Sequence, residues 1–573
     1  MLDVVIKGGS VIDGTGSPAR RADVGIQGDR IVQIGAIDTD AASVIDATGK
    51  VVTPGFVDIH THFDAQVFWD GALTPSPLHG VTTALAGNCG FTIAPLSDDP
   101  RDGEYLMRML ARVEGMPLES LREGVPWNWR TTAEYFDAIE GTLGINAGFM
   151  VGHSAIRRIV MGTDATARTA TPDELEGMRR LLRDGLEAGA LGFSSSWART
   201  HNDADGKMVP SRYASHDEIV ELARVLRAWP GTSLEFIPMV GPKFEPWAVV
   251  LMTAMSGAAQ RQLNWNVMNV SAANLADCQA KLEAGDYARA RDAKVVALTV
   301  PMNFGVRLSF RSGFVLDAMP EWEDVMLLPF DEKLAVFRDP AARARLDELA
   351  QLPTNPLRSL ANWGNKVIFD VVAPENEQYR GRLVADIAAE QGRGAWDVLC
   401  DIALADELNT SFGSIPPAET DEDWKARLDV WRDRRAVIGA SDAGAHLDLL
   451  ASFNYATELL GKAVRQRAML PLEEAVHLIT DVQARLYGLT NRGRVAEGWY
   501  GDLVVLDPTT IGSHDVGMRF DLPAGAGRLY AEADGIEHVL VNGAPIVRDG
   551  KLTDERPGTL LRSGRDTETS PLD

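Results

Sequence analysis

The sequence predicts a mixed α/β fold, a (β/α)8 TIM barrel joined to a small β-sandwich that both ends of the chain build. Eight short apolar runs alternate with helical stretches through the middle of the chain, which is the pattern of a parallel barrel covered by helices. Runs of β-branched residues separated by Gly and Asp turns fill the first fifty residues and return after residue 493. The length of 573 residues, of which 45% are apolar, allows a large buried core and more than one domain.

The two ends of the chain both predict antiparallel strands. Gly28 and Asp29 are expected to close one hairpin, and Asn542 and Gly543 a second, because such dipeptides fit the tight turns between antiparallel strands. A short sheet with one open face is marginal by itself. We therefore expect residues 1–54 and 490–562 to share one β-sandwich. Residues 563–573 form a polar tail in this interpretation.

Residues 55–489 predict alternating strands and helices. Thr171 and Ser215 each precede a Glu by three residues, the spacing of a capping box, and apolar residues follow at helical period. The expected strands are VVTPGFVDI, VTTALAG, INAGFMVG, ALGFSSS, SLEFIPMV, LNWNVMNV, AKVVALTV and AVIGAS. The last two are too far apart for a plain connection, so we expect an insertion at about 303–430 that covers the substrate site.

Charge and cysteine content exclude several classes of protein. The chain has 56 Lys and Arg against 81 Asp and Glu, a net charge of −25, and no basic patch, so neither nucleic acid nor a membrane is an expected partner. Its cysteines, Cys89, Cys278 and Cys400, are too few for a disulfide framework. The first residues lack the basic and apolar regions of a signal peptide. We expect a cytoplasmic protein that acts on a small molecule, and a homo-oligomer is compatible with this composition.

His60 and His62 directly follow the first barrel strand. Because they are two residues apart on an extended chain, both imidazoles point to the same side, which at the C-terminal end of a barrel strand faces the mouth. Two convergent imidazoles are good ligands for a borderline ion such as zinc. The alternative is a pair of surface histidines at a strand end, but the motif GFVDIHTH in a barrel-like chain favours a metal site.

Five motifs resemble the amidohydrolase superfamily. They are VVTPGFVDIHTHFDAQ, GVTTALAGNCGF, MVGHSAIR, IGASDAGAH and RGRVAEGWYGDLVVLDP, and they occur in the order seen in the family. Within it the chain is most similar to the D-aminoacylase or N-acyl-D-amino-acid deacylase group. The resemblance implies a metal-bearing barrel, a β-sandwich from both termini, and hydrolysis of an amide or related bond.

The resemblance also implies roles for two residues. The cysteine of the GNCG motif binds zinc in similar deacylases, so Cys89 is a candidate ligand; the alternative is an inert residue in a Gly-rich turn. The aspartate of the SD pair holds the attacking water and takes its proton, so Asp442 is the expected general base and a further metal ligand. The alternative for Asp442 is a turn residue before Gly444.

Two positions depart from the family pattern. Similar deacylases carry a histidine at the end of the fifth strand and another at the end of the sixth, where this chain has Glu235 and Asn266. Glutamate can provide an oxygen ligand, but asparagine is a poor zinc ligand. Glu235 is therefore a candidate metal ligand, with an ordinary buried strand residue as the alternative. We expect one or two divalent metal ions, with Zn2+ as the first choice.

The loop after the fourth strand also departs from the family pattern, which leaves the preference for D-amino acids open. Arg199 offers a planar fork suited to a carboxylate, and His201 suits either a metal or a substrate. His446, His153 and Arg157 are further candidates for substrate binding. A capping or core role is the alternative for His446, and a surface ion pair is the alternative for Arg157.

These observations favour a metal-dependent hydrolase that cleaves the amide bond of N-acyl amino acids, N-acyl-D-amino acids included. Cleavage is expected through a metal-bound hydroxide, with Asp442 as general base. The same residues could instead cleave a cyclic amide, a urea or a lactone, which would need no arginine for a carboxylate. A binding protein without activity, on a degraded barrel, is the third alternative. The chain has no nucleotide fingerprint and no nucleophile elbow.

Overall fold

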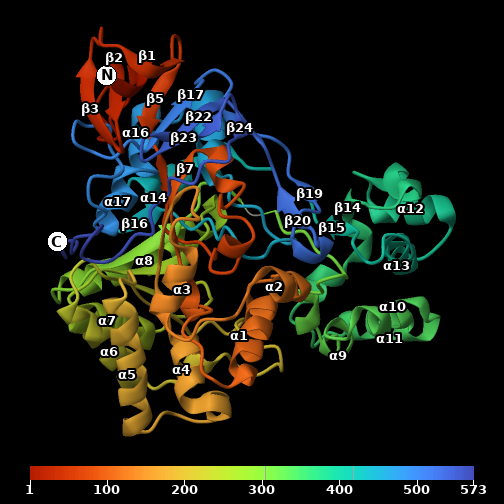
Figure 1. Cartoon of the computed structure of the whole chain (residues 1–573). Coiled ribbons are helices and arrows are strands. Elements are labelled where there is room, and N and C mark those ends of the chain that lie inside the picture. The colour runs from red at the N-terminus through yellow and green to blue at the C-terminus, as the bar shows by residue number, and fades with distance from the viewer. Residues whose placement is uncertain (304, 417) are drawn as a thin grey trace.

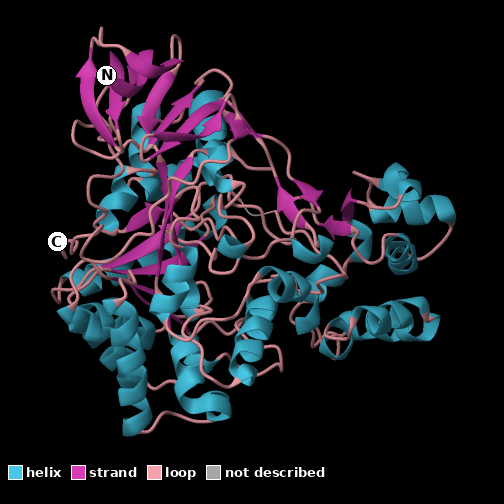
Figure 2. Cartoon of the chain, viewed as in Figure 1, coloured by secondary structure: helices cyan, strands magenta, loops and turns pink. Residues whose placement is uncertain are grey.

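The computed structural model describes residues 1–303, 305–416 and 418–573, and its fold is mixed α/β. Figure 2 shows one group of strands at the top and another in the centre, with helices around and below the central group. The predicted mixture of strands and helices is therefore confirmed. No helix of the described residues combines the length and the apolar character needed to span a bilayer.

The first and last parts of the chain share one nine-stranded sheet, which lies beside the N-terminus in Figure 1. Its strands are β1 (Leu2–Val11), β2 (Arg20–Gln27), β3 (Arg30–Gly35), β4 (Ala41–Asp46), β5 (Val51–Pro54), β17 (Leu503–Leu506), β22 (Ile536–Val541), β23 (Ala544–Arg548) and β24 (Lys551–Leu552). The two parts are joined by the antiparallel pairing of β5 with β17, in which Val52 lies opposite Val505. The strands expected at both ends of the chain therefore meet in a single sheet.

Both predicted hairpin turns are present in this sheet. Gly28 lies between β2 and β3 with a φ of 60°, and Asn542 and Gly543 lie between β22 and β23 with φ of 48° and 82°. Asn and Gly adopt positive φ at little cost, and such turns match the twist of the strands that they join. Aliphatic side chains fill the core on this sheet: Ile6, Val24, Ile26, Ile31, Val505 and Leu540.

The central strands are parallel and pair in chain order. One sheet runs β6–β7–β8, and the other runs from β9 through β10, β11, β12 and β13 to β16. The strands are β6 (Phe56–Asp58), β7 (Val81–Ala86), β8 (Asn146–Phe149), β9 (Val151–Gly152), β10 (Gly192–Ser196), β11 (Ser233–Ile237), β12 (Leu263–Met268), β13 (Val295–Thr299) and β16 (Ala436–Ile438). Every predicted run contains a strand, and Met150 alone separates the two pieces of the third.

The outer edges of these two sheets meet just beyond β6 and β16. The amide of Asp442 donates to the carbonyl of His60 at 3.0 Å, and the amide of His62 donates to the carbonyl of Ala443 at 2.7 Å. The residues that follow the first and the last central strands therefore run side by side. This contact brings the predicted histidines to the predicted aspartate.

Helices connect the central strands. They are α1 (Pro100–Val113), α2 (Leu118–Gly124), α3 (Thr132–Ile139), α4 (His153–Met161), α5 (Pro172–Glu187), α6 (His216–Val225), α7 (Pro246–Ala259), α8 (Leu275–Arg289), α14 (Asp421–Trp431), α15 (Tyr455–Glu458), α16 (Leu472–Leu478) and α17 (Asp481–Leu486). Thr171 forms the predicted capping box of α5. At α6, Ser215 caps the amide of Glu218, whereas the Glu218 carboxylate binds His153 and Arg157 instead of completing a box.

The segment between β13 and α14 folds around a core of its own and projects to one side in Figure 1. Its elements are α9 (Glu323–Met326), α10 (Phe330–Arg338), α11 (Pro340–Ala350), β14 (Val367–Asp370), α12 (Val384–Gln391), α13 (Ala395–Ala405) and β15 (Ser411–Gly413). Its core is rich in aromatic side chains: Phe310, Trp322, Phe337, Trp363, Trp396 and Phe412. The segment touches the loop after β16, because the amide of Arg307 donates to the carbonyl of Leu449 at 2.9 Å.

A hairpin near the C-terminus also reaches the loop after β16, which the sequence pattern did not predict. It consists of β19 (Gly517–Arg519) and β20 (Arg528–Tyr530), next to the short pair β18 (Gly512–Ser513) and β21 (Ala533–Asp534). The amide of Leu529 donates to the carbonyl of Leu447 at 2.6 Å. The part of the chain that builds the nine-stranded sheet therefore also contributes to the surroundings of Asp442.

The last residues, predicted as a polar tail, are held against the central part of the chain. Thr567 Oγ1 donates to the carbonyl of Gly231 at 2.6 Å, and Ser570 Oγ donates to the carbonyl of Leu486 at 2.9 Å. Residues 558–561 run beside β8 and not in the sheet, which ends at Leu552. The polar side chains of this tail therefore pair with backbone groups of the body of the protein.

Candidate metal centre and active site

His60 and His62 lie together beyond the end of β6, as their spacing predicts. Both are buried, and their rings meet edge to face with centroids 5.3 Å apart. The Nε2 atoms of both imidazoles approach the same carboxylate oxygen, Oδ1 of Asp442. The geometry is that of two ligands directed at one point.

Cys89 reaches the histidines through a turn with an unusual backbone. Gly87, Cys89 and Gly90 all have positive φ, of 78°, 57° and 77°. A side chain at Gly87 would come within 2.7 Å of the backbone nitrogen of Met150, so the turn requires glycine there. The Cys89 Sγ lies 3.5 Å from His60 Nε2 and 3.8 Å from His62 Nε2. One ligand atom from each of these three residues fits within 4.8 Å of the others.

Asp442 faces both histidines from the loop after β16. Its Oδ1 lies 3.3 Å from His60 Nε2 and 3.2 Å from His62 Nε2. The φ of Asp442 is 57°, a conformation that aspartate adopts more readily than most residues. Its side chain keeps 25% of its surface exposed, whereas the histidine side chains keep 1%. Asp442 is therefore the member of the cluster that a substrate can reach.

Glu235 and Asn266 border the same cluster from β11 and β12. Glu235 Oε2 accepts a hydrogen bond from the Cys89 amide at 2.7 Å. Asn266 Nδ2 lies 3.1 Å from His60 Nε2 and 3.8 Å from Cys89 Sγ. The second carboxylate oxygen of Glu235, Oε1, and the amide oxygen of Asn266, Oδ1, are both buried and have no hydrogen-bond partner among the described residues. The two positions that depart from the family pattern thus lie at the cluster itself.

Three further buried carboxylates surround the cluster, and the sequence analysis missed them. Glu114, at the end of α1, has its Oε1 3.5 Å from His62 Nδ1. Asp64 accepts a hydrogen bond from the Gly87 amide at 3.0 Å, at the start of the Cys89 turn. Asp58 accepts a hydrogen bond from the Ser441 hydroxyl, in the loop after β16. The alternation Asp58, His60, His62, Asp64 carries a signal for the two aspartates. Glu114 has no such signal, because only the fold brings the end of α1 to this place.

So many buried carboxyl groups call for a positive counter-charge. Burial raises the pKa of four of them, Asp64 to about 6, Asp58 and Glu114 to about 7, and Glu235 to about 8. Burial acts to lower the pKa of His62, but the carboxylates around it raise that pKa to about 9. Burial acts to raise the pKa of Asp442, but its contacts with the two histidines hold that pKa well below its ordinary value. A cation in the cluster would relieve the crowded negative charge.

The donor atoms fit a divalent cation. Two imidazole nitrogens and a thiol sulfur converge, and carboxylate oxygens of Asp442 and Glu235 lie beside them. Burial raises the pKa of the Cys89 thiol, and a bound cation has the opposite effect because it stabilises the thiolate. Zinc accepts ligands of all three types. The residues could therefore hold zinc, with the carboxylates supplying the compensating charge.

His446 and His201 lie close to Asp442 without joining the three-residue cluster. His446 Nε2 is 3.8 Å from Asp442 Oδ2, and its ring packs 5.0 Å from the ring of Phe314. The ring of His201 packs 5.1 Å from Phe91, which follows the Cys89 turn. Burial, followed by the charge of His446, lowers the pKa of His201 to about 3, so the imidazole is neutral near pH 7. Both residues remain candidates for substrate contact.

His153 and Arg157, which the sequence analysis expects to bind substrate, are buried in this fold and paired with other groups of the protein. Arg157 is fully buried, and its guanidinium binds the Glu218 carboxylate and three backbone carbonyls. His153 lies between Ser195 Oγ at 2.8 Å and Glu218 Oε1 at 3.1 Å. The ion pair of Arg157 with Glu218 is buried and not at the surface, where the alternative interpretation expected it. A guanidinium that is fully enclosed and paired with a carboxylate is not open to a substrate carboxylate in this structure.

Arg199 is exposed on the loop after β10 and has an arginine as its neighbour. Its carbonyl accepts from Arg212 Nη1 at 3.3 Å, and Arg212 also donates to the carbonyl of His201 at 3.5 Å. Within the described parts of the chain, neither guanidinium has a carboxylate partner. Two adjacent arginines without a counter-charge, in a chain of net charge −25, form a local surface suited to an anion.

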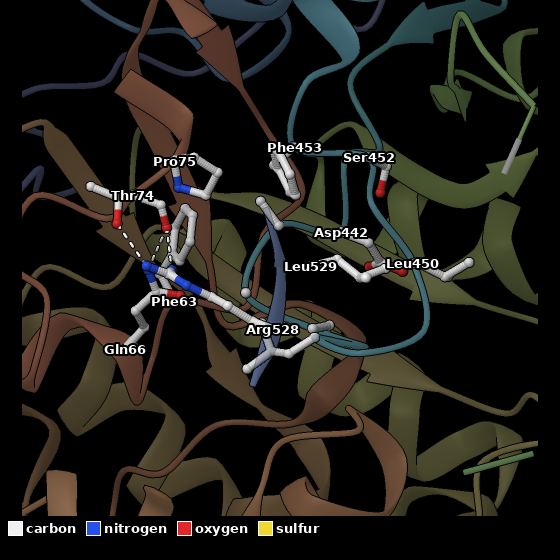
Figure 3. A pocket seen from close by; sticks show the side chains of 14 residues that line it. Phe63, Gln66, Thr74, Pro75, Asp442, Leu450, Ser452, Phe453, Arg528 and Leu529 are labelled. Atoms are coloured by element: carbon white, nitrogen blue, oxygen red, sulfur yellow. Dashed lines mark hydrogen bonds between the residues drawn. The ribbon is translucent and has the colours of Figure 1, made fainter. Parts of the chain in front are cut away.

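Figure 3 shows a narrow pocket beside Asp442. Apolar side chains line most of it: Phe63, Pro75, Leu447, Leu450, Phe453 and Leu529. Arg528 also lines the pocket, but its guanidinium binds Thr74 at 2.6 and 2.9 Å and Asp521 at 2.8 Å. The pocket therefore offers an apolar surface next to Asp442 and no unpaired cation.

Comparison with known proteins gives one consistent result. A model of the amidohydrolase family matches residues 43–547. N-acyl-D-glutamate deacylase from Alcaligenes xylosoxydans xylosoxydans is 31% identical over 570 residues, which covers 98% of this chain and 96% of that protein. A structure of D-aminoacylase, a protein with a binuclear metal center, has a TM-score of 0.65 and 27% identity, covering 98% of this chain and 100% of that chain. N-acyl-D-glutamate deacylase from Bordetella bronchiseptica, solved with zinc and a phosphonate inhibitor, has a TM-score of 0.64 and 26% identity at the same coverage.

Proposed function

This chain belongs to the amidohydrolase family, and from this premise we propose that it is a metal-dependent hydrolase that cleaves the amide bond of N-acyl amino acids. One observation carries the proposal: His60, His62 and Cys89 converge within 4.8 Å, and the partly exposed Asp442 lies against both imidazoles. Two relatives that align over nearly the whole chain are N-acyl-D-glutamate deacylases, which makes N-acyl-D-amino acids the first substrates to test.

The residues of this chain can carry out each proton transfer of such a reaction. A zinc ion, when bound, acts as a Lewis acid on the scissile carbonyl and on the attacking water. Asp442 takes a proton from the water as its oxygen adds to the carbonyl carbon. Asp442 then gives this proton to the nitrogen as the carbon–nitrogen bond breaks, leaving a carboxylic acid and a free amine. His446, 3.8 Å from Asp442, is placed to donate a hydrogen bond to a substrate oxygen.

The proposed function requires the strands to present their C-terminal ends to one opening, and we propose that they form a closed (β/α)8 barrel. Three observations support closure of the barrel. The strands pair in parallel and in chain order, and a single residue separates β8 from β9. His60 and His62 form backbone hydrogen bonds with the loop after β16. We assign residues 55–489 to the barrel, with the insertion at about 303–430. Residues 1–54 and 490–552 then form the β-sandwich, and the packed tail completes the chain.

We also propose that the insertion covers the barrel mouth. Phe314 of the insertion packs on the ring of His446, and Arg112 of α1 forms an ion pair with Asp317 of the insertion. Both contacts lie at the end of the central strands that carries Asp442. An insertion in this position would limit which acyl groups and amines can enter.

The metal site itself yields a first testable prediction. We expect Cys89→Ala to lower zinc affinity at least about a hundredfold, because it removes a charged ligand. Mutation of residues that only hydrogen-bond to a metal ligand already lowers metal affinity about 10- to 100-fold. The measurement is zinc content by mass spectrometry after dialysis against a weak chelator. Cys278→Ala, a buried free cysteine of α8, is the matched control and should keep its zinc. Full zinc content in Cys89→Ala would show that Cys89 is no ligand.

A second prediction concerns the carboxylate of the substrate. With Arg157 and Arg528 already paired, Arg199 beside Arg212 is the group that we assign to this carboxylate. We expect Arg199→Gln to raise KM for N-acyl amino acids about tenfold or more, the scale of one charged hydrogen bond, and to leave kcat nearly unchanged. Arg224→Gln, an exposed arginine of α6 that pairs with Glu221, is the control. An equal effect on the corresponding uncharged amino acid amides would contradict the assignment.

The experiment that tests the function is a hydrolysis screen combined with metal quantitation. The zinc-loaded protein is assayed with four classes of compound: N-acyl-D-amino acids, N-acyl-L-amino acids, uncharged amides and cyclic amides. Turnover of the first group supports the proposal, whereas turnover of cyclic amides alone would favour the alternative substrate class. A metal-free protein whose melting temperature does not rise with zinc would favour a binding protein, because a ligand held by the native state must stabilise it.

The state of the cysteines supports a cytoplasmic location as part of this proposal. All three are free and buried, and Cys89 must remain a thiol to bind a metal.

A further inference from the structure

We infer that Lys366 and Ser414 bind a carboxylate at the far end of the acyl group, so that the preferred substrates are amino acids whose nitrogen carries a dicarboxylic acyl group, of which succinyl is an example. The inference rests on the proposed function and defines one end of its substrate. Both residues belong to the insertion and line a groove between the insertion and the residues that follow β12 and β13.

The pairing of β14 with β15 brings these two side chains together. Val367 lies opposite Gly413 in this antiparallel pair, so Lys366 and Ser414, one residue outside them, are neighbours as well. Lys366 Nζ donates a hydrogen bond to Ser414 Oγ at 3.1 Å. An ammonium group has three hydrogens and a hydroxyl has one, so the pair keeps donors for an anion.

Lys366 lacks the counter-charge that a buried lysine needs. Only 1% of the residue is exposed, and no carboxylate lies within ion-pair distance of its Nζ among the described residues. Burial alone lowers the pKa of this amine from its ordinary value. Lys333, a second buried lysine of the insertion, differs because the charges of Glu119 and Asp448 act on it. A buried ammonium without a partner is costly, and a ligand carboxylate would supply the missing charge.

The groove combines this buried amine with apolar walls. Leu308 and Gly413 are buried and form its floor beside Lys366. Val306 and Ile415 at its rim are 39% and 65% exposed. A matching ligand has a short apolar chain that ends in an anionic group. The methylene groups and the terminal carboxylate of a succinyl group have this character.

The groove lies within reach of the metal cluster. Asn269 lines the groove and is three residues beyond Asn266, whose Nδ2 lies 3.1 Å from His60 Nε2. Three extended residues span about 11 Å at most. A substrate whose amide bond is at the cluster can therefore place its far end in the groove.

The acyl end suits this groove better than the side chain of the amino acid does. The α-carboxylate is assigned to Arg199 on the loop after β10, whereas the groove lies beyond β12 and β13. Neighbouring strands are about 4.8 Å apart, so the loops after β10 and β13 start roughly 14 Å from one another. The two carboxylates of glutamate lie on the same side of the amide bond. Those of a succinyl amino acid lie on opposite sides and further apart, which suits the separation of the two anchors.

Hydrolysis of two matched compounds by the zinc-loaded protein tests the inference. N-succinyl-D-alanine and N-butyryl-D-alanine have acyl chains of equal length and differ only in a terminal carboxylate or methyl group. We expect kcat/KM of the parent to be at least about tenfold higher for the succinyl compound, the scale of one charged hydrogen bond. Lys366→Met, which keeps most of the side-chain length and removes the charge, should abolish this difference and leave the butyryl compound nearly unchanged.

Two further variants complete this comparison. Lys333→Met removes the charge of a buried lysine in the same segment and should keep the parental preference. Ser414→Ala changes an exposed residue, which favours an intact fold. It should weaken the preference about threefold or more, the scale of one neutral hydrogen bond. The melting temperature shows whether each variant is folded.

Binding of the released acids provides a readout without turnover. The zinc-loaded protein is titrated with succinate and with butyrate in a calorimeter. The parent should bind succinate at least about tenfold more tightly than butyrate. Lys366→Met should bind the two acids with similar affinity.

The possible failures are distinguishable. A parent that cleaves both compounds and binds both acids equally well would overturn the inference and leave the proposed function standing. A preference for N-acetyl-D-glutamate over N-acetyl-D-glutamine that disappears in Lys366→Met would place the amino acid side chain in the groove and overturn the assignment to the acyl end. A protein that binds succinate through Lys366 but cleaves no N-acyl amino acid would overturn the proposed function and not the carboxylate site.

Discussion

Replacing Asp442 by asparagine is expected to lower turnover about a hundredfold or more while the protein stays folded and keeps most of its metal. The carboxylate is the partly exposed member of the cluster and the group assigned to both proton transfers. Asparagine has nearly the same size and can still offer an oxygen atom, but it cannot accept the proton of the attacking water. The measurements are kcat on the best substrate of the screen, the melting temperature and the bound zinc.

The same loop offers a matched control for this substitution. Asp448 lies six residues further on and hydrogen-bonds to Ser312 of the insertion. Asp448→Asn should therefore change kcat little. If Asp442→Asn hydrolyses the substrate at nearly the parental rate, Asp442 is not the general base, and His446 becomes the next residue to test.

Removing residues 493–573 is expected to leave the chain insoluble. The deletion takes away β17, β22, β23 and β24, so β5 loses its antiparallel partner and the aliphatic core around Ile6, Val24 and Ile26 is opened to water. It also removes the tail that binds to the carbonyls of Gly231 and Leu486. Unpaired strand edges and exposed apolar surface both promote aggregation.

A short deletion separates this effect from a general intolerance of C-terminal change. Removal of residues 571–573 alone keeps the sheet and the bonds of Thr567 and Ser570, so the melting temperature should stay close to that of the full chain. Solubility and melting temperature are the readouts for both deletions. A soluble 493–573 deletion with an unchanged melting temperature would show that the two ends of the chain do not depend on one another.

The sequence predicted the strands and hairpins because these depend on neighbouring residues. Apolar runs bounded by turn residues mark β10 and β11, and Asn542 with Gly543 marks a hairpin through backbone preferences alone. The shared direction of His60 and His62 also follows from local geometry, since side chains two residues apart on an extended chain point the same way. The resemblance to a known family added the roles expected of Cys89 and Asp442.

What surrounds these residues was decided by the tertiary structure. Glu114 reaches His62 because α1 ends there, and Asn266 reaches His60 because β12 ends beside the cluster. Arg157 looked like a substrate ligand in the sequence and proved to be a buried partner of Glu218. A sequence pattern records which way a side chain leaves its own strand or helix. Whether its charge is exposed or already paired depends on groups from distant segments, and only the packing of those segments determines this.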